Sequence, residues 1–224
     1  MRAAPASFRT ALVAGASGLV GREILAGLLA DRSLAKVHTL GRRELPATHP
    51  KLEQHVVDFA TLPALPPVDE VYLALGTTIK VAGSQQAFRA VDHDANLAVA
   101  RAARKAGATR LALVSAMGAD ARSSIFYNRV KGELEAALAG LGYEALVIAR
   151  PSMLAGDRQS LGQPVRSGEV LALRVSTALR PLIPANFRSI RAADVAAALL
   201  QALPRARGTT VLPSGAMQGA SARA

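Results

Sequence analysis

The segment from Ala11 to Arg22, which reads ALVAGASGLVGR, constrains the fold of this chain more than any other. An apolar run leads directly into three glycines spaced three apart, Gly15, Gly18 and Gly21, and a helical pattern follows. In such a turn the first glycine allows a tight bend, the second lets the backbone approach a phosphate, and the third lets helix and strand pack closely. The following helix directs free N–H groups and its positive dipole end at the same point. The segment therefore predicts a strand, a turn and a helix that together hold a pyrophosphate.

Short β-type runs alternate with helical patterns along the chain, which is typical of a parallel sheet covered by helices. The predicted strands are 11–15, 36–41, 52–57, 70–75, 110–115, 145–150 and 210–212. The predicted helices are 21–31, 85–106, 124–140 and 193–203. The expected fold class is α/β: a Rossmann-type doubly wound parallel sheet with helices on both faces and a small C-terminal cap region.

The chain has 224 residues, half of them apolar, which is enough for one core. We expect a single NAD(P)-binding domain over residues 1–213. Within it, the irregular segment 154–188 should lie as a cap over the C-terminal edge of the sheet, where ligands bind in open α/β folds. The small and polar residues 214–224 are expected to form a disordered tail.

The composition argues against several classes of protein. A net charge of +11 would suit nucleic acid, but the arginines are scattered and aromatic residues make up only 4% of the chain, so no nucleic-acid partner is expected. There is no cysteine, and the four histidines, His38, His49, His55 and His93, fall at no recognised metal-ligand spacing. We therefore expect no metal site.

The first twenty residues carry two arginines before an apolar run, as a signal peptide would, but Gly15, Ser17 and Gly18 interrupt that run. No stretch approaches the roughly 18 apolar residues of a membrane span. We expect a soluble, cytoplasmic protein without a membrane span. The sequence leaves open whether it forms a homo-oligomer.

The end of the second strand indicates which dinucleotide is bound, because the residue there reads the adenosine ribose. Arg42 and Arg43 occupy that place, and arginines form charge-assisted hydrogen bonds with the 2′-phosphate of NADP where a carboxylate would bind the ribose of NAD. Asp58 could accept a hydrogen bond from the adenine, or it could cap a turn. The fourth strand runs into Leu75, Gly76 and Thr77, which should contact the same cofactor.

A second set of residues carries chemistry. Tyr127 and Lys131 are spaced by four on a predicted helix and share one face of it, and Ser115 ends the preceding strand. A nearby ammonium favours the phenolate form of a tyrosine, as general acid/base catalysis requires. The serine could then hold the substrate oxygen. We predict Ser115, Tyr127 and Lys131 as catalytic residues, with Ser123 and Ser124 as weaker candidates for the hydroxyl.

Taken together, these motifs resemble an atypical member of the short-chain dehydrogenase/reductase superfamily, closest to its Tat-interacting-protein (oxidoreductase) branch of NADP-binding proteins. The matching stretches are 15–22, 40–43, 56–59, 75–78, 81–83, 114–120, 127–133, 150–151 and 156–159. The resemblance implies a tyrosine-centred active site and a set of residues around NADP(H). With the positions inferred above, that cofactor set is Gly15, Ser17, Gly18, Leu19, Val20, Gly21, Arg42, Arg43, Asp58, Leu75, Gly76, Thr77, Tyr127, Lys131 and Arg158.

One departure matters: Ala116 follows Ser115 where that branch tends to carry a second serine. The sequence favours an NADP-dependent oxidoreductase acting on a small carbonyl or alcohol. The alternatives are a non-catalytic NADP(H)-binding regulator and an enzyme like the nucleotide-sugar epimerases and dehydratases, although the chain lacks their long C-terminal substrate domain. The substrate itself is not indicated.

Overall fold

The computed structural model describes residues 8–155 and 184–223. A parallel sheet of seven strands runs through it, in the spatial order β3-β2-β1-β4-β5-β6-β9. Its strands are β1 (Arg9–Ala14), β2 (Leu34–Gly41), β3 (Leu52–Val56), β4 (Glu70–Leu73), β5 (Arg110–Val114), β6 (Ala145–Arg150) and β9 (Gly208–Pro213). The order reverses direction between β1 and β4, which is the point where doubly wound folds bind their ligands. The predicted fold class is confirmed.

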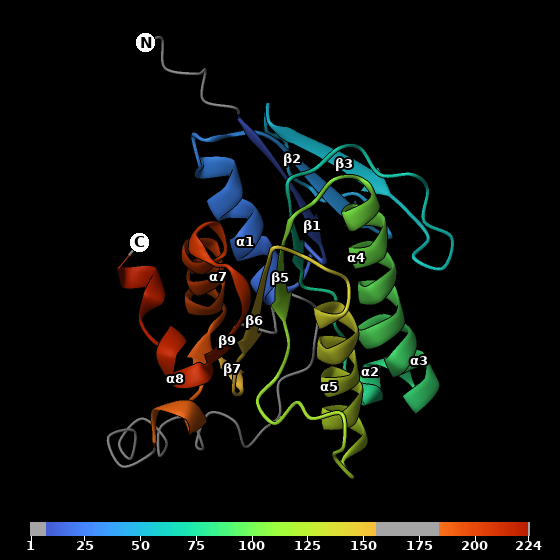
Figure 1. Cartoon of the computed structure of the whole chain (residues 1–224), viewed down its shortest axis with the longest axis vertical. Coiled ribbons are helices and arrows are strands. Elements are labelled where there is room, and N and C mark those ends of the chain that lie inside the picture. Colours follow the sequence, from blue (N-terminus) through green and yellow to red (C-terminus); the bar gives the residue numbers. More distant parts are fainter. Residues whose placement is uncertain (1–7, 156–183, 224) are drawn as a thin grey trace.

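Helices cover both faces of this sheet (Figure 1). On one face lie α1 (Leu19–Ala30) and α7 (Ala192–Ala202), which pack side by side. On the other lie α3 (Gln85–Arg89), a π-helical turn η1 (Ala90–Ala95), α4 (Asn96–Lys105) and α5 (Phe126–Ala139). None of the described helices is both long and apolar enough to span a membrane.

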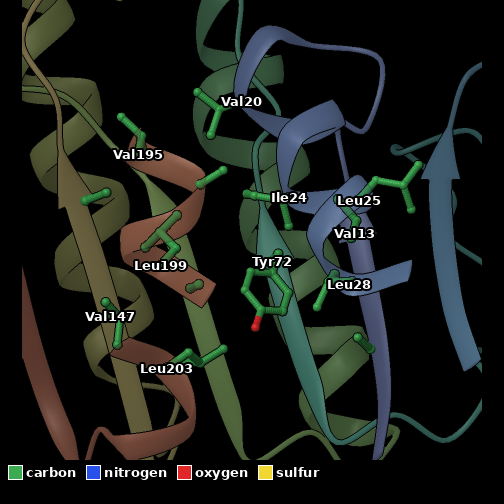
Figure 2. Close-up of a cluster of buried hydrophobic side chains, with 14 of the residues drawn as sticks. Val13, Val20, Ile24, Leu25, Leu28, Tyr72, Val147, Val195, Leu199 and Leu203 are labelled. Atoms are coloured by element: carbon green, nitrogen blue, oxygen red, sulfur yellow. The ribbon is translucent and has the colours of Figure 1, made fainter. Parts of the chain in front are cut away.

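Two hydrophobic cores separate the layers, because successive strand residues point to opposite faces. In β1, Ala11 and Val13 belong to the core beneath α1 and α7, whereas Leu12 and Ala14 belong to the core beneath α4 and α5. Figure 2 shows the first core, in which the side chains of α1 face those of α7 above the sheet. Both faces of the central strands are therefore buried, which explains their nearly continuous apolar sequences.

The predicted strands and long helices are all present, and the structure adds shorter elements to them. These are α2 (Ile79–Ala82), the strand pair β7 (Leu154–Ala155) and β8 (Ile190–Arg191), α8 (Ser214–Met217), and the 3-10 turns η4 (Ala185–Phe187), η5 (Leu203–Arg205) and η6 (Ala220–Ala222). Most of the predicted cap, residues 156–183, lies outside the described residues, and Arg158 lies there with it.

The expectation of a disordered tail was wrong for residues 214–223. Met217 and Ala220 are buried in the core beside α7. Ser221 donates hydrogen bonds from its N–H and hydroxyl to Asp194 on α7, at 3.0 and 2.7 Å. Burial would raise the pKa of Asp194, but the hydrogen bonds from Arg191 and Ser221 outweigh it and lower that pKa to about 2. Packing and a buried carboxylate thus order a segment whose composition looks polar.

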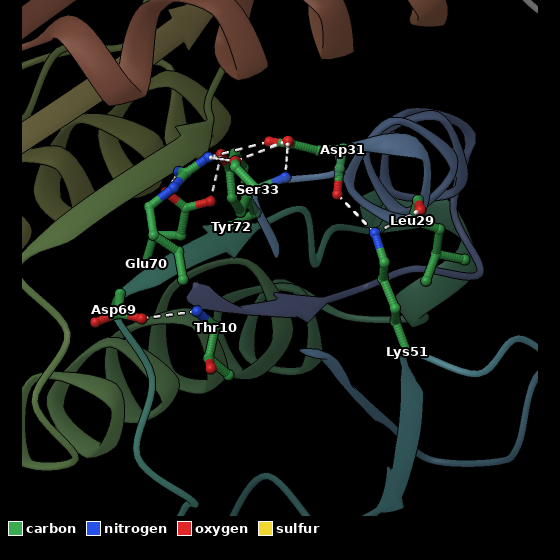
Figure 3. Close-up of polar contacts among 9 residues, drawn as sticks. Thr10, Leu29, Asp31, Ser33, Lys51, Asp69, Glu70 and Tyr72 are labelled. Atoms are coloured by element: carbon green, nitrogen blue, oxygen red, sulfur yellow. Dashed lines mark hydrogen bonds and ion pairs between the residues drawn. The ribbon is translucent and has the colours of Figure 1, made fainter. Parts of the chain in front are cut away.

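Polar side chains tie the strands together at the N-terminal edge of the sheet (Figure 3). Arg9 donates to Glu70 at 2.6 Å, to Asp31 at 3.0 Å and to Ser33 at 2.8 Å. The Glu70 side chain is fully buried and also accepts a hydrogen bond from the Tyr72 hydroxyl at 3.4 Å. Burial raises the pKa of Glu70, and Arg9 opposes that rise. Arg9, on β1, therefore compensates the buried negative charge of Glu70, on β4.

Replacing Arg9 with leucine should lower the free energy of unfolding by about 3 kcal/mol at neutral pH, because it leaves Glu70 buried without a cation. A raised carboxyl pKa means that folding takes up a proton. The loss in the free energy of unfolding is therefore largest above the pKa of Glu70, and it becomes smaller as the pH falls and Glu70 is protonated. Urea unfolding of the wild type and the variant across a pH series measures both effects.

The matched control is Arg122→Leu, since that side chain is 95% exposed and lies 4.0 Å from Asp120. It should change the free energy of unfolding by less than about 0.5 kcal/mol. An Arg9→Leu deficit equal to that of the control, or one that grows at acidic pH, would contradict this account of Glu70.

Candidate functional site

The glycine turn leaves no room for side chains. Gly15 adopts a φ of +90°, and a Cβ there would lie 2.4 Å from the carbonyl oxygen of Ala74, at the end of β4. A Cβ on Gly21 would lie 2.0 Å from the carbonyl oxygen of Gly15. Backbone contacts this short do not tolerate even alanine, so the sequence requirement at both positions is steric. The turn thus presses β1, β4 and α1 together at the C-terminal edge of the sheet.

The N-terminus of α1 suits an anion. Gly18 is the N-cap residue and supplies no capping side chain, and no acidic residue lies in the first turn. The first N–H groups of a helix have no partner within the helix. Together with the dipole, they provide positive potential beside the turn.

A cavity of about 590 Å³ extends from this turn across the ends of β2 and β3. The predicted cofactor residues that line it are Gly15, Ser17, Gly18, Arg42, Arg43, Asp58, Leu75 and Gly76. The described residues Leu19, Val20, Gly21, Thr77, Tyr127 and Lys131 do not line it. Asp58 accepts a hydrogen bond from the N–H of Ala60 at 2.9 Å, so it caps its own turn while facing the cavity.

Two helical segments run alongside each other next to the cavity with matched spacing. The ring of Phe88 on α3 lies 5.5 Å from the ring of Tyr127 on α5, centroid to centroid. One helical turn further along each segment, Asp92 on η1 accepts from Lys131 on α5, with Oδ1 and Nζ 2.7 Å apart. Both side chains of this ion pair are buried, 1% and 5% exposed. The ion pair therefore fixes the position of α5 along its axis relative to η1.

Asp92 also connects Lys131 to the cavity wall. Its Oδ2 accepts the backbone N–H of Thr77 at 2.8 Å, and its Oδ1 lies 3.5 Å from where a Cβ of Gly76 would be. Gly76 lines the cavity, so the ammonium of Lys131 lies immediately behind that wall. Asp92 was not predicted, because a carboxylate within an apolar helical pattern carries no signal of its partner. The π-helical turn that carries it is a local geometry often found at functional sites.

Ser115 has an internal partner. Its hydroxyl donates to Oε1 of Glu135 on α5 at 2.5 Å, and the serine is 5% exposed. Arg150 donates to the same carboxylate from Nε at 3.2 Å and from a terminal nitrogen at 2.5 Å. The hydrogen bond with Glu135 raises the pKa of Arg150 above its ordinary value. The network joins the ends of β5 and β6 to α5, and Glu135 and Arg150 were not predicted.

Curated proteins similar to this chain include Protein FMP52, mitochondrial, from Eremothecium gossypii, which is 39% identical over 153 residues. The protein of the same name from Coccidioides immitis is 36% identical over 166 residues. In both cases the match covers 67% of this chain and 68% of the relative. This chain belongs to the FMP52 family. No protein-family profile matches its sequence.

The FMP52 relatives correct one expectation and leave another as a prediction. The expected cytoplasmic location is contradicted, because the relatives are named as mitochondrial proteins. The narrower assignment to the Tat-interacting-protein branch is not confirmed by these names. The matched stretch spans about two thirds of each FMP52 relative.

Solved structures similar to this FMP52-family chain confirm a fold of the short-chain dehydrogenase/reductase type. A short chain dehydrogenase family protein from Francisella tularensis has a TM-score of 0.69 at 12% identity, covering 93% of this chain and 98% of its own. MoeE5 in complex with UDP-glucose and NAD has a TM-score of 0.65 at 16% identity, covering 91% and 76%. A UDP-N-acetylglucosamine 4-epimerase from Methanobrevibacter ruminantium has a TM-score of 0.66 at 17% identity, covering 92% and 76%. At these identities the likeness shows the fold alone.

The buried ion pair between Asp92 and Lys131 predicts a loss of stability when its anion is removed. Asp92→Asn keeps the shape of the side chain but leaves the Lys131 ammonium buried without an anion, so it should lower the free energy of unfolding by about 3 kcal/mol. Urea unfolding of the wild type and the variant measures the difference.

Asp94→Asn is the control, because Asp94 lies on the same helical turn but is 60% exposed and pairs with His93. It should change the free energy of unfolding by less than about 0.5 kcal/mol, since exposed charges are screened. A deficit in Asp92→Asn no larger than that in Asp94→Asn would refute the stabilising role of the buried pair.

Proposed function

We propose that this chain is an NADP-dependent oxidoreductase of the short-chain dehydrogenase/reductase type that acts on a small carbonyl or alcohol. The observation that carries the proposal is one continuous arrangement at the C-terminal edge of the sheet. The glycine turn and the two arginines line a single cavity, and the buried Lys131 lies behind the Gly76 wall of that cavity. Kinship with the Tat-interacting-protein branch belongs to the same proposal.

The cavity fits a dinucleotide on three counts. At Gly15 and Gly21, backbone atoms occupy the space that a side chain would need. No side chain therefore blocks the N-terminus of α1, which also lacks a capping side chain and can accept a phosphate. Arg42 and Arg43 are exposed at the far end of the cavity, where the ribose of the adenosine would lie. The volume of about 590 Å³ falls within the range of cofactor pockets.

The residues of α5 would handle the proton. When bound, the nicotinamide supplies or accepts a hydride, and the substrate oxygen must gain or lose a proton in the same reaction. Tyr127 exchanges that proton through its phenol, and Lys131 lies one helical turn further along the same face of α5. Asp92 holds the Lys131 ammonium in place and offsets part of its charge.

Ser115 takes a different part in this proposal from the one that its position in the sequence suggests. A serine whose hydrogen is donated to Glu135 has only lone pairs left, and it cannot also donate to a substrate carbonyl. We assign it to positioning: it holds the end of β5 against α5 and so fixes the helix that carries Tyr127.

The second candidate is a non-catalytic NADP(H)-binding regulator. One observation favours it: the hydroxyl of Ser115 and the ammonium of Lys131 are both satisfied within the protein. A panel of small carbonyls with NADPH, and of alcohols with NADP, separates the two functions. Turnover of any member supports the oxidoreductase, and binding of NADPH without turnover supports the regulator.

Arg42→Ala and Arg43→Ala should each weaken NADPH binding and leave NADH binding unchanged. Losing a hydrogen bond to a charged group costs about 1.5–3 kcal/mol, which corresponds to a roughly 10- to 100-fold higher Kd. Titration of the intrinsic fluorescence of NADPH and NADH measures it. The control is Arg122→Ala, a fully exposed arginine that does not line the cavity. Equal affinity of the wild type for NADPH and NADH would refute the role of both arginines.

Tyr127→Phe should lower kcat by about 10²–10⁴-fold, as expected for loss of a general acid or base, and leave the Kd for NADPH within about twofold. Ser115→Ala should lower kcat only a few-fold, because it removes one neutral-donor hydrogen bond worth about 1 kcal/mol. Steady-state kinetics with the best substrate of the panel test both variants. A loss in Ser115→Ala as large as that in Tyr127→Phe would show that the serine acts on the substrate directly.

A further inference from the structure

Two of the four histidines meet on the sheet. His38 on β2 and His55 on β3 are 17 residues apart in the sequence, yet their Nδ1 and Nε2 atoms lie 2.9 Å apart. Their ring centroids are separated by 5.1 Å. His38 is buried, whereas 27% of the His55 side chain is exposed. One ring is therefore fixed in the core and the other can be reached from solvent.

Glu53 completes the cluster. Its Oε1 lies 3.8 Å from Nε2 of His55, and one ligand atom from each of the three residues lies within 4.8 Å of the others. The second carboxylate oxygen, Oε2, accepts from Nζ of Lys36 at 2.7 Å. Lys36 thus holds the carboxylate in the rotamer that turns Oε1 toward the imidazoles.

The sheet register explains why these side chains meet. His38 pairs with Glu53, and Leu40 pairs with His55, across the parallel β2–β3 ladder. Because side chains alternate between faces, residues 38, 40, 53 and 55 all project from the same face. The cluster is therefore a product of strand pairing, with no sequence motif of its own.

We propose that His38, Glu53 and His55 form a binding site for a divalent transition-metal ion, and that Zn²⁺ is the ion they fit best. Two imidazole nitrogens and one carboxylate oxygen are a common protein ligand set for Zn²⁺, with water in the fourth position. Zn–N and Zn–O distances of about 2.0–2.2 Å place two tetrahedral ligands about 3.3 Å apart. The observed separations of 2.9 and 3.8 Å lie on either side of that value.

A bound ion would act on both the sheet and the cavity. β3 is the edge strand of the sheet, so the ion would join it to β2 by bonds that do not depend on the backbone ladder. His55 also lines the cavity, as do Arg42 and Arg43, which follow β2. The site does not rely on any residue of the proposed reaction, so it stands or falls independently of the oxidoreductase assignment.

The test uses the full-length protein without a histidine tag, freed of metal by a chelator. Isothermal titration with Zn²⁺ should show one site per chain, and Co²⁺ should give visible absorption bands of a site with nitrogen ligands. Zn²⁺ should raise the Tm of the wild type, because an ion that binds only the folded state stabilises it. His55→Gln and Glu53→Gln should each weaken Zn²⁺ binding about tenfold or more.

His49→Gln is the matched control, since it removes a histidine near β3 that is not part of the cluster. It should bind Zn²⁺ as the wild type does. A Zn²⁺-dependent rise in Tm that persists in His55→Gln, or binding that is lost in His93→Gln and kept in His55→Gln, would overturn the assignment. Absence of Zn²⁺ and Co²⁺ binding by the wild type would also overturn it, leaving the 2.9 Å contact as a hydrogen bond between the two rings.

Discussion

The contact between Gly15 and the end of β4 sets the geometry of the whole C-terminal edge of the sheet. A side chain there would overlap the carbonyl of Ala74, and one on Gly21 would overlap the carbonyl of Gly15. Because neither residue has a side chain, α1 can begin close to the end of β1, and its N-terminus faces the cavity. The same close approach brings Leu75 and Gly76 beside the turn, so both lie on one cavity wall. The cavity wall at the glycine turn is therefore backbone, which leaves no room for a bulkier residue at Gly15 or Gly21.

A second close approach positions the helix that carries the proposed chemistry. A Cβ on Gly132 would lie 2.2 Å from backbone atoms of Asp120 and Ala121, so α5 lies directly against the segment that follows β5. Along its other side, α5 contacts Phe88 and Asp92 one helical turn apart. The backbone contact at Gly132 and the buried Asp92–Lys131 ion pair thus fix both the rotation of α5 about its axis and its position along that axis. Among the described residues, these contacts position Tyr127.

The sequence predicted what depends on local pattern and missed what depends on register between elements. Strand alternation and the glycine turn identify the sheet, its helices and the cavity wall at Arg42 and Arg43. No pattern within η1 identifies Lys131 as the partner of Asp92, because that pairing depends on how two helices lie against each other. The same holds for His38 and His55, which meet only through the β2–β3 register. The tail was missed because burial of Met217 is a property of the assembled core.

The ion pairs at the two edges of the sheet have opposite consequences. At the N-terminal edge, Arg9 compensates the buried Glu70 and links β1 to β4, and its side chain is 24% exposed, so part of its charge stays in contact with water. At the C-terminal edge, Lys131 and Asp92 are both buried, so their attraction must offset the loss of water from two charges. A hydrophobic pair of similar size would stabilise the fold at least as well. Retaining two charges there makes physical sense if a ligand or a proton at the adjoining cavity uses their field.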